Sequence, residues 1–362
     1  MRSAALWILC SAVGLAQRQA PPPSATVNPD RTVTFRLAAP KAALVQVSGD
    51  LTKGPQALQR DEKGVWTLTL GPLAPAIYSY SFIIDGVRAI DPASGFIKPG
   101  VNSTSTLLEV PGEMFYDMQP VPHGTVHIHW YHSEAIGAPR SVYVYTPPGY
   151  EAGKQNYPVL YLLHGSGDTE SGWVTVGRAN LILDNLIAAG KAKPMVVVMP
   201  FGHPLPAVGL GAPGARGGDR AAFTAELLDQ LMPMVEKTYR VSAKAEDRAI
   251  AGLSMGGGQS FSIGITHLDR FRWIGVFSMG MRGSEAEQPW AGALADGAAV
   301  NRQLRLLWIA CGKADGLFGP AQALSGALAK HKIKHTFQAS EGGHTWWVWR
   351  GYLHEFAPLL FR

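Results

Sequence analysis

The sequence has little charge and almost no cysteine. Of its 362 residues, 16% are charged and 2 are cysteines, whereas 46% are hydrophobic. This balance excludes an extensively disordered chain and indicates a packed globular protein. The formal net charge is +5, but the one local lysine run, at residues 330–334, is interleaved with histidine. Such a run is typical of a solvated helix end, so we expect no nucleic-acid partner.

Long hydrophobic runs are also missing after the N-terminus, which itself resembles an export signal. Arg2 precedes an apolar stretch at residues 4–15 and a small-residue cleavage site near Ala16. The stretch is too short to anchor the protein in a bilayer, so we expect a secreted or periplasmic protein without a membrane anchor. Cleavage would remove Cys10 and leave Cys311 without a disulfide partner, which predicts a buried, inert thiol.

The segment that points most directly to chemistry is Gly-Leu-Ser-Met-Gly at residues 252–256, a G-x-S-x-G sequence. A serine hydroxyl stands free to attack a carbonyl on a tight turn from strand to helix, where side chains two positions to either side would collide. Residues 249–251 form a short apolar strand, and residues 256–267 are suited to a helix. We therefore predict that Ser254 is a catalytic nucleophile.

A candidate acid and base follow Ser254 in the chain order of an α/β-hydrolase. Asp315 follows a predicted strand, and His344 lies in a glycine-rich loop after the last predicted strand. We predict that His344 takes and returns the serine proton and that Asp315 fixes the imidazole tautomer. A plain Asp-Gly turn is the alternative for Asp315. Glu341 is a rival acid, but it is too near His344 in sequence to reach the ring from behind.

The apolar run at residues 157–163 is typical of a central parallel strand buried on both faces. It ends in His164-Gly165, where a hydrolase places its oxyanion loop. We therefore predict that the backbone N–H groups of Ser166 and Met255 bind the negative oxygen of the tetrahedral intermediate.

Strands and helices alternate from this run to the C-terminus. This alternation predicts an α/β-hydrolase fold with a doubly wound parallel sheet and ligands at the carboxyl ends of its strands. One predicted helix, residues 220–239, contains Pro233 and is expected to kink there.

Three histidines, His127, His129 and His132, lie in a strand-like segment, and the first two share a strand face. No cysteine and no nearby carboxylate pair completes a metal site, so we interpret them as surface histidines. We expect neither a metal nor an organic cofactor.

Residues 26–110 predict a small β-sandwich, because strand-like segments with alternating polarity are separated by turns such as Asp85-Gly86. Trp66 and Tyr80 form either an exposed glycan platform or part of the sandwich core, since alternation does not say which face meets water.

The N-terminal pattern resembles the family 48 carbohydrate-binding modules, and this resemblance implies a small immunoglobulin-like β-sandwich of the early-set type. The resemblance rests on a turn at residues 47–50, then Gly64-Val65-Trp66, the Asp85-Gly86 hairpin and Asp91-Pro92. Proline and glycine accumulate at residues 111–123, which we interpret as a linker to a second domain at residues 124–362.

The second domain resembles carbohydrate esterase family 1, which includes feruloyl and acetyl-xylan esterases. The matching motifs are His164-Gly165 followed by Trp173, residues 248–257, Cys311-Gly312 with Asp315, and residues 342–346 with Trp349. The resemblance implies a triad of Ser254, Asp315 and His344 with Ser166 and Met255 as oxyanion donors. Trp173 and Trp346 are expected to contact the substrate. Met279, Met281 and Trp290 either line an acyl pocket or belong to the core.

The leading hypothesis is a secreted serine carboxylic-ester hydrolase that releases feruloyl or acetyl groups from plant cell-wall xylan. Its substrate is an ester-bearing small molecule or polysaccharide, and the pattern points to no particular oligomeric state. A siderophore esterase and an acyltransferase are the alternatives within enzymes. A glycan-binding protein without catalysis is disfavoured, since it has no need of a strained serine turn followed by an acid and a histidine in this order.

Overall fold

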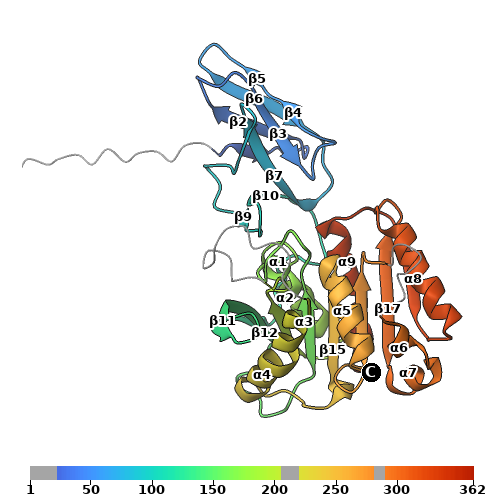
Figure 1. The fold of residues 1–362 in the computed structure, drawn as a ribbon. Helices are drawn as coiled ribbons and strands as arrows, with labels where there is room; N and C mark the ends of the chain where they lie inside the picture. Colours follow the sequence, from blue (N-terminus) through green and yellow to red (C-terminus); the bar gives the residue numbers. More distant parts are fainter. Residues whose placement is uncertain (1–22, 205–219, 281–289) are drawn as a thin grey trace, which may run out of the picture.

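The computed structural model describes residues 23–204, 220–280 and 290–362. The predicted export signal, residues 1–16, and Met281 lie outside this part of the chain. A β-domain at the N-terminal end stands on a larger α/β domain (Figure 1). Within the described ranges, no helix is long and apolar enough to cross a membrane.

The N-terminal domain is a sandwich of two antiparallel sheets, ordered β1-β2-β6-β5 and β4-β3-β7-β10-β9, with β8 paired to β7. The strands are β1 (Ala25–Val27), β2 (Val33–Ala38), β3 (Val45–Gly49), β4 (Gln56–Ala57), β5 (Gln59–Arg60), β6 (Val65–Leu70), β7 (Ala76–Ile84), β8 (Val87–Ala89), β9 (Ile97–Lys98) and β10 (Ser105–Val110). Phe35 of β2 meets Tyr80 of β7 with ring centroids 5.2 Å apart, so the two sheets share one core.

The two aromatics left open by the sequence both belong to that core. Trp66 is 6% exposed and donates its indole N–H to the carbonyl of Ala39 at 2.9 Å. Tyr80 is 2% exposed and donates its hydroxyl to Asp91. A glycan platform built on these two rings is therefore wrong.

The C-terminal domain is built on an 8-stranded sheet ordered β11-β12-β14-β13-β15-β16-β17-β18. The strands are β11 (Thr125–Ser133), β12 (Ala138–Thr146), β13 (Val159–Leu163), β14 (Val196–Pro200), β15 (Arg248–Leu253), β16 (Trp273–Phe277), β17 (Leu306–Gly312) and β18 (Thr336–Ser340). From β14 to β18 every neighbouring pair is parallel, whereas β11 and β12 pair antiparallel. The α/β-hydrolase prediction is confirmed, with a mixed rather than fully parallel sheet, because a short hairpin joins β11 to β12.

Helices cover both faces of the sheet (Figure 1). One face packs against α1 (Gly172–Thr175), α2 (Ala179–Ala188), α9 (Trp346–Phe356) and the 3-10 turn Ala357–Leu359. The other packs against α3 (Arg220–Ala225), the π-helix η1 (Glu226–Leu231), α4 (Met232–Thr238), α5 (Met255–Thr266), α6 (Ala291–Leu294), α7 (Gly297–Gln303) and α8 (Phe318–Lys330). A second 3-10 turn, Ala245–Asp247, leads into β15.

The helix predicted to kink at Pro233 carries a π-helical turn, η1, which ends two residues before the proline. Proline has no N–H to donate to the preceding turn, so the α-helical ladder is interrupted at this point. The π-helical turn also carries Glu226, which is buried.

The two domains share buried surface. Ile77 of β7 and Leu107 of β10 belong to the same core cluster as α2 and α9, and Tyr116 of the predicted linker joins them. Asn185 of α2 donates to the carbonyls of Phe115 and Asp117 at 3.0 and 2.9 Å, so the linker segment is packed against the α/β domain.

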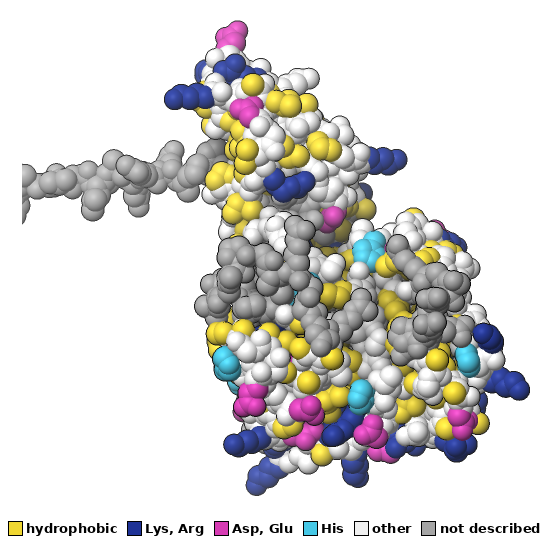
Figure 2. Space-filling model, in the orientation of Figure 1, with side chains coloured by type: hydrophobic (Ala, Val, Ile, Leu, Met, Phe, Trp, Pro, Cys, Tyr) yellow, Lys and Arg dark blue, Asp and Glu magenta, His cyan; other side chains and the backbone are white. Residues whose placement is uncertain are grey.

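Charged side chains are spread over the molecular face shown in Figure 2. Lysine and arginine are interspersed there with aspartate and glutamate and do not gather in one basic patch. The lysine run identified in the sequence begins at Lys330, the last residue of α8, which agrees with a solvated helix end.

Candidate active site

Ser254 lies at the turn between β15 and α5, with φ 53° and ψ −115°. Residues other than glycine rarely adopt a positive φ, so the backbone at Ser254 is strained. A Cβ added at Gly252 would lie 2.6 Å from the backbone of Gly256, and one at Gly256 would lie 2.6 Å from the carbonyl oxygen of Leu163. The expected steric reason for both glycines is confirmed.

The structure brings the three predicted catalytic side chains together. His344 Nε2 lies 2.9 Å from Ser254 Oγ, and His344 Nδ1 lies 2.8 Å from Asp315 Oδ2. The Asp315 side chain is 1% exposed and also accepts the Leu317 backbone N–H at 2.8 Å. The rival acid, Glu341, is 79% exposed and pairs with Lys313 instead.

The loop after β13 passes directly beside Ser254. A Cβ added at Gly165 would lie 3.5 Å from Ser254 Cβ and 2.6 Å from Leu253 Cδ1. Ser166 is exposed in this loop, and Met255 is the first residue of α5. A first-turn N–H has no acceptor within its own helix, so it is available to a ligand. The loop that carries Ser166 and the helix that begins at Met255 thus both adjoin Ser254.

His164 anchors the start of this loop, which we call the oxyanion loop (residues 164–168). Its Nδ1 donates to the carbonyl of Gly165 at 2.8 Å, and its Nε2 accepts the Gly202 N–H at 2.9 Å. Burial lowers the pKa of His164 to about 3, so the ring is neutral at pH 7 with its proton on Nδ1. The sequence pointed to His164-Gly165 but not to this role.

The two tryptophans predicted to contact substrate lie beneath the site. Trp173 is fully buried and donates its indole N–H to the carbonyl of Leu163 at 3.0 Å. Trp346 is 8% exposed and packs edge-on between Trp173 and Trp349. The predicted substrate contacts are therefore wrong, and both rings are packing residues. They support Trp349, whose ring centroid lies 4.9 Å from that of His344.

Other singled-out residues are part of the packing. Met279 and Trp290 are half-buried and pack against the core cluster that includes α5. Cys311 is buried, as predicted, and burial raises the pKa of its thiol to about 12. His127 contacts Thr146, and His129 contacts Tyr239.

A protein-family model described as "Putative esterase" matches residues 133–358, which is more than half of the chain. The chain belongs to this esterase family.

Curated relatives and solved structures refine the family. A relative from Xylanibacter ruminicola, an endo-1,4-beta-xylanase/feruloyl esterase, is 33% identical over 351 residues, 93% of this chain. This chain spans only 46% of the length of that relative.

Among solved structures, a ferulic acid esterase of carbohydrate esterase family 1 from Anaeromyces mucronatus, in complex with ferulic acid, has TM-score 0.58. It is 24% identical and covers 68% of this chain and 93% of its own. The enterobactin esterase from Shigella flexneri has TM-score 0.64 at 20% identity and covers 90% of this chain and 92% of its own. At these identities the structures establish the fold alone. With the family and the relative, the chain is a member of the esterase family that is similar to feruloyl esterases.

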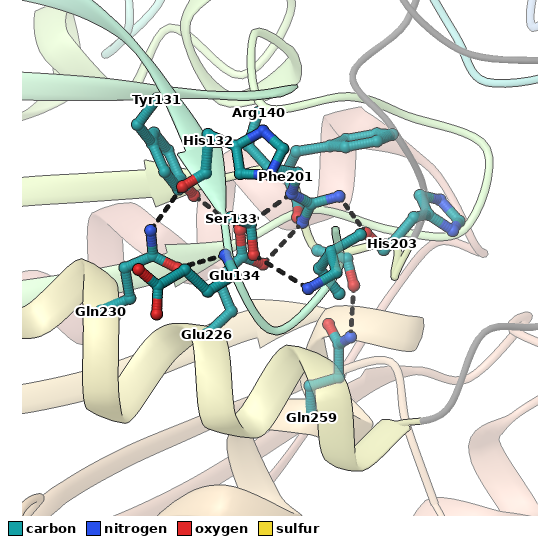
Figure 3. A network of polar contacts seen from close by, with 12 residues as sticks. Tyr131, His132, Ser133, Glu134, Arg140, Phe201, His203, Glu226, Gln230 and Gln259 are labelled. Atoms are coloured by element: carbon teal, nitrogen blue, oxygen red, sulfur yellow. Dashed lines mark hydrogen bonds and ion pairs between the residues drawn. The ribbon is translucent and has the colours of Figure 1, made fainter. Parts of the chain in front are cut away.

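The esterase holds a buried network behind the oxyanion loop that sequence reasoning missed (Figure 3). Arg140 of β12 is fully buried and donates to both carboxylate oxygens of Glu226 in η1 at 2.9 Å. It also donates to the carbonyls of Phe201 and His203. Because Gly202, between them, donates to His164, this ion pair supports the oxyanion loop from behind.

The elbow helix contributes to the same support. Gln259 of α5 donates to the carbonyl of Gly202 at 2.6 Å. In the sequence, Phe201-Gly202-His203 matched no pattern, and Arg140 stood alone as a charged residue in a largely apolar strand. Its partner is 86 residues away, so local sequence carried no signal for the pair.

Proposed function

We propose that the protein hydrolyses carboxylic esters through an acyl-enzyme on Ser254. The observation that carries this proposal is the Ser254–His344–Asp315 chain of contacts on a strained turn. His344 Nε2 takes the hydroxyl proton while Ser254 Oγ bonds to the ester carbonyl carbon. The carbonyl oxygen becomes an anion and is bound by the N–H groups of Ser166 and Met255. Asp315 stabilises the imidazolium that forms.

The intermediate then collapses in the same site. The bond to the leaving alcohol breaks, and His344 gives its proton to that alcohol, which leaves the acyl group on Ser254. A water molecule attacks the acyl carbon with His344 again as base, and the acid departs as the Ser254 hydroxyl is restored. An acyltransferase would differ in one respect, since a second alcohol would replace the water.

We propose feruloyl or acetyl esters on xylan-type polysaccharide as the substrate. The support is the Xylanibacter ruminicola relative, whose name includes both xylanase and feruloyl esterase and which matches 93% of this chain. The proposal includes export of the protein through residues 1–16, which N-terminal sequencing of the released protein would test.

Hydrolysis of a siderophore trilactone is the second candidate. The observation in its favour is that the enterobactin esterase structure covers 90% of this chain, so its likeness extends over both domains. The ferulic acid esterase structure covers 68%.

The deciding experiment compares rates of wild type and Ser254→Ala on methyl ferulate, a short acetyl ester and a catecholate trilactone. Wild type should prefer methyl ferulate, and the variant should lose about 10⁶-fold in kcat with a nearly unchanged thermal midpoint. Hydrolysis retained by Ser254→Ala would refute the nucleophile. Preference for the trilactone would favour the second candidate function, siderophore hydrolysis, with the same catalytic residues.

A further inference from the structure

The oxyanion loop is held from its far side by the N-terminal domain. Lys98, at the end of β9, forms an ion pair with Asp168, the last residue of the oxyanion loop. The side chains are 15% and 7% exposed, so the pair is largely withdrawn from water. Figure 1 shows β9 at the end of the N-terminal domain that faces α1. The two residues are 70 positions apart and belong to different domains.

A second contact shows how closely the two segments approach. A Cβ added at Gly100, two residues beyond Lys98, would lie 2.5 Å from the carbonyl oxygen of Gly167. Backbone therefore lies against backbone here, with no room for a side chain between them. The segment after β9 thus contacts the carbonyl of Gly167, the residue next to the predicted oxyanion donor Ser166.

The Asp168 carboxylate links this contact to the shape of the loop. The backbone N–H of Asp168 donates to the carbonyl of Gly165 at 3.1 Å, which closes a tight turn around Ser166 and Gly167. His164 holds the other end of the same turn through that carbonyl. A buried carboxylate that loses its cation is strongly unfavourable and tends to move toward water. Loss of the Lys98 charge would therefore displace Asp168 and with it the turn that orients the backbone N–H of Ser166.

We propose that Lys98 is a positioning residue for the oxyanion loop. The N-terminal domain would then help to fix the geometry of the active site. The inference rests on the proposed function, in which the N–H of Ser166 binds the oxyanion. It differs from a detachable glycan-binding role, because it predicts an effect on small esters that carry no polysaccharide.

A matched control crosses the same domain boundary. Arg178, at the start of α2, pairs with Glu109 of β10 at 2.5 Å. This pair does not include the oxyanion loop. Glu109→Gln therefore tests loss of an interdomain ion pair as such, whereas Lys98→Met removes the charge at the loop and keeps most of the side-chain volume.

The experiment measures kcat and KM of the full chain on a short soluble acetyl ester. It also measures the affinity of the chain for an aryl boronic acid that mimics the tetrahedral intermediate. Lys98→Met should lower kcat by about 10- to 100-fold, less than complete loss of an oxyanion donor, with little change in KM. Boronate affinity should fall by a similar factor. Lys98→Arg should recover most of the rate, and Glu109→Gln should stay near wild type.

Hydrogen exchange of the amides at residues 165–168 in the resting protein gives a readout that needs no turnover. Exchange should be faster in Lys98→Met than in wild type or Glu109→Gln. Equal losses in Lys98→Met and Glu109→Gln, or a Lys98→Met protein as active and as protected as wild type, would overturn the inference. An inactive wild type with the expected exchange pattern would instead refute the proposed function and leave the Lys98 contact supported.

Discussion

At the scale of single residues, Asp315 shows how one carboxylate sets the state of a neighbouring ring. Leu317 N–H donates to Oδ1 at 2.8 Å, and His344 Nδ1 faces Oδ2 at 2.8 Å. A carboxylate accepts both hydrogen bonds, which keeps the imidazole proton on Nδ1. Nε2 is then free to accept the proton of Ser254.

We expect Asp315→Asn to invert this arrangement. The asparagine oxygen would accept from Leu317, which turns the amide N–H₂ toward His344 and favours the tautomer with its proton on Nε2. That tautomer accepts nothing from Ser254, so kcat should fall by about 10⁴-fold at neutral pH with little change in KM. Steady-state kinetics on a soluble ester measures this. The control is Glu341→Gln, which removes the rival acid; a larger loss there than in Asp315→Asn would reverse the assignment.

At the scale of secondary-structure elements, the Arg140–Glu226 pair joins β12 and η1 to the segment after β14. Glu226 also accepts the hydroxyl of Tyr131 at 2.9 Å, so three donors converge on one buried carboxylate. Removal of one partner from a buried ion pair leaves the other charge uncompensated.

Glu226→Gln should therefore lower the free energy of unfolding by about 3–5 kcal/mol, measured by urea denaturation. The double variant Arg140→Met/Glu226→Gln should lose less than the sum of the two single variants, because no charge is then stranded. The exposed pair of Lys313 and Glu341 is the comparison, and its Glu341→Gln variant should change stability by about 1 kcal/mol or less. An additive double variant would show that the two side chains are not coupled.

The elements also show which parts of the site a sequence can predict. Ser254, Asp315 and His344 each follow a strand of the same sheet, so strand order and local motifs were sufficient to place them on one edge. Lys98 and Arg140 act through partners in other elements, at separations of 70 and 86 residues, and no periodic pattern marks such pairs.

The orientation of the aromatic residues could not be predicted from the sequence, for a different physical reason. Trp346 is two residues from His344 in sequence, but α9 turns its ring inward onto Trp173 instead of toward the surface. Trp66 and Tyr80 alternate correctly with polar neighbours, but alternation does not distinguish the core face from the wet face. Neither closeness to a catalytic residue in sequence nor strand alternation therefore fixes which way an aromatic ring faces.

At the scale of the whole molecule, the two domains are joined by apolar contact as well as by charge. Ile77 and Leu107 of the N-terminal domain are 4% and 2% exposed within a core that includes α2 and α9. Arg350 of α9 lies over the ring of Tyr116, in the segment between the domains, at 4.4 Å. Unfolding of the N-terminal domain alone would expose this shared surface, which opposes separate unfolding.

We therefore expect the full chain to unfold in one calorimetric transition, with equal calorimetric and van't Hoff enthalpies. Val47→Ala, in the core confined to the N-terminal domain, should cost about 2 kcal/mol through lost methyl burial and the cavity left behind. It should move the whole transition to lower temperature, as should Val198→Ala in the sheet of the α/β domain. Two resolved peaks, with Val47→Ala shifting one and Val198→Ala the other, would show that the domains unfold independently. Esterase activity lost on heating Val47→Ala should follow the same single transition, because the segment that carries Lys98 unfolds with the rest.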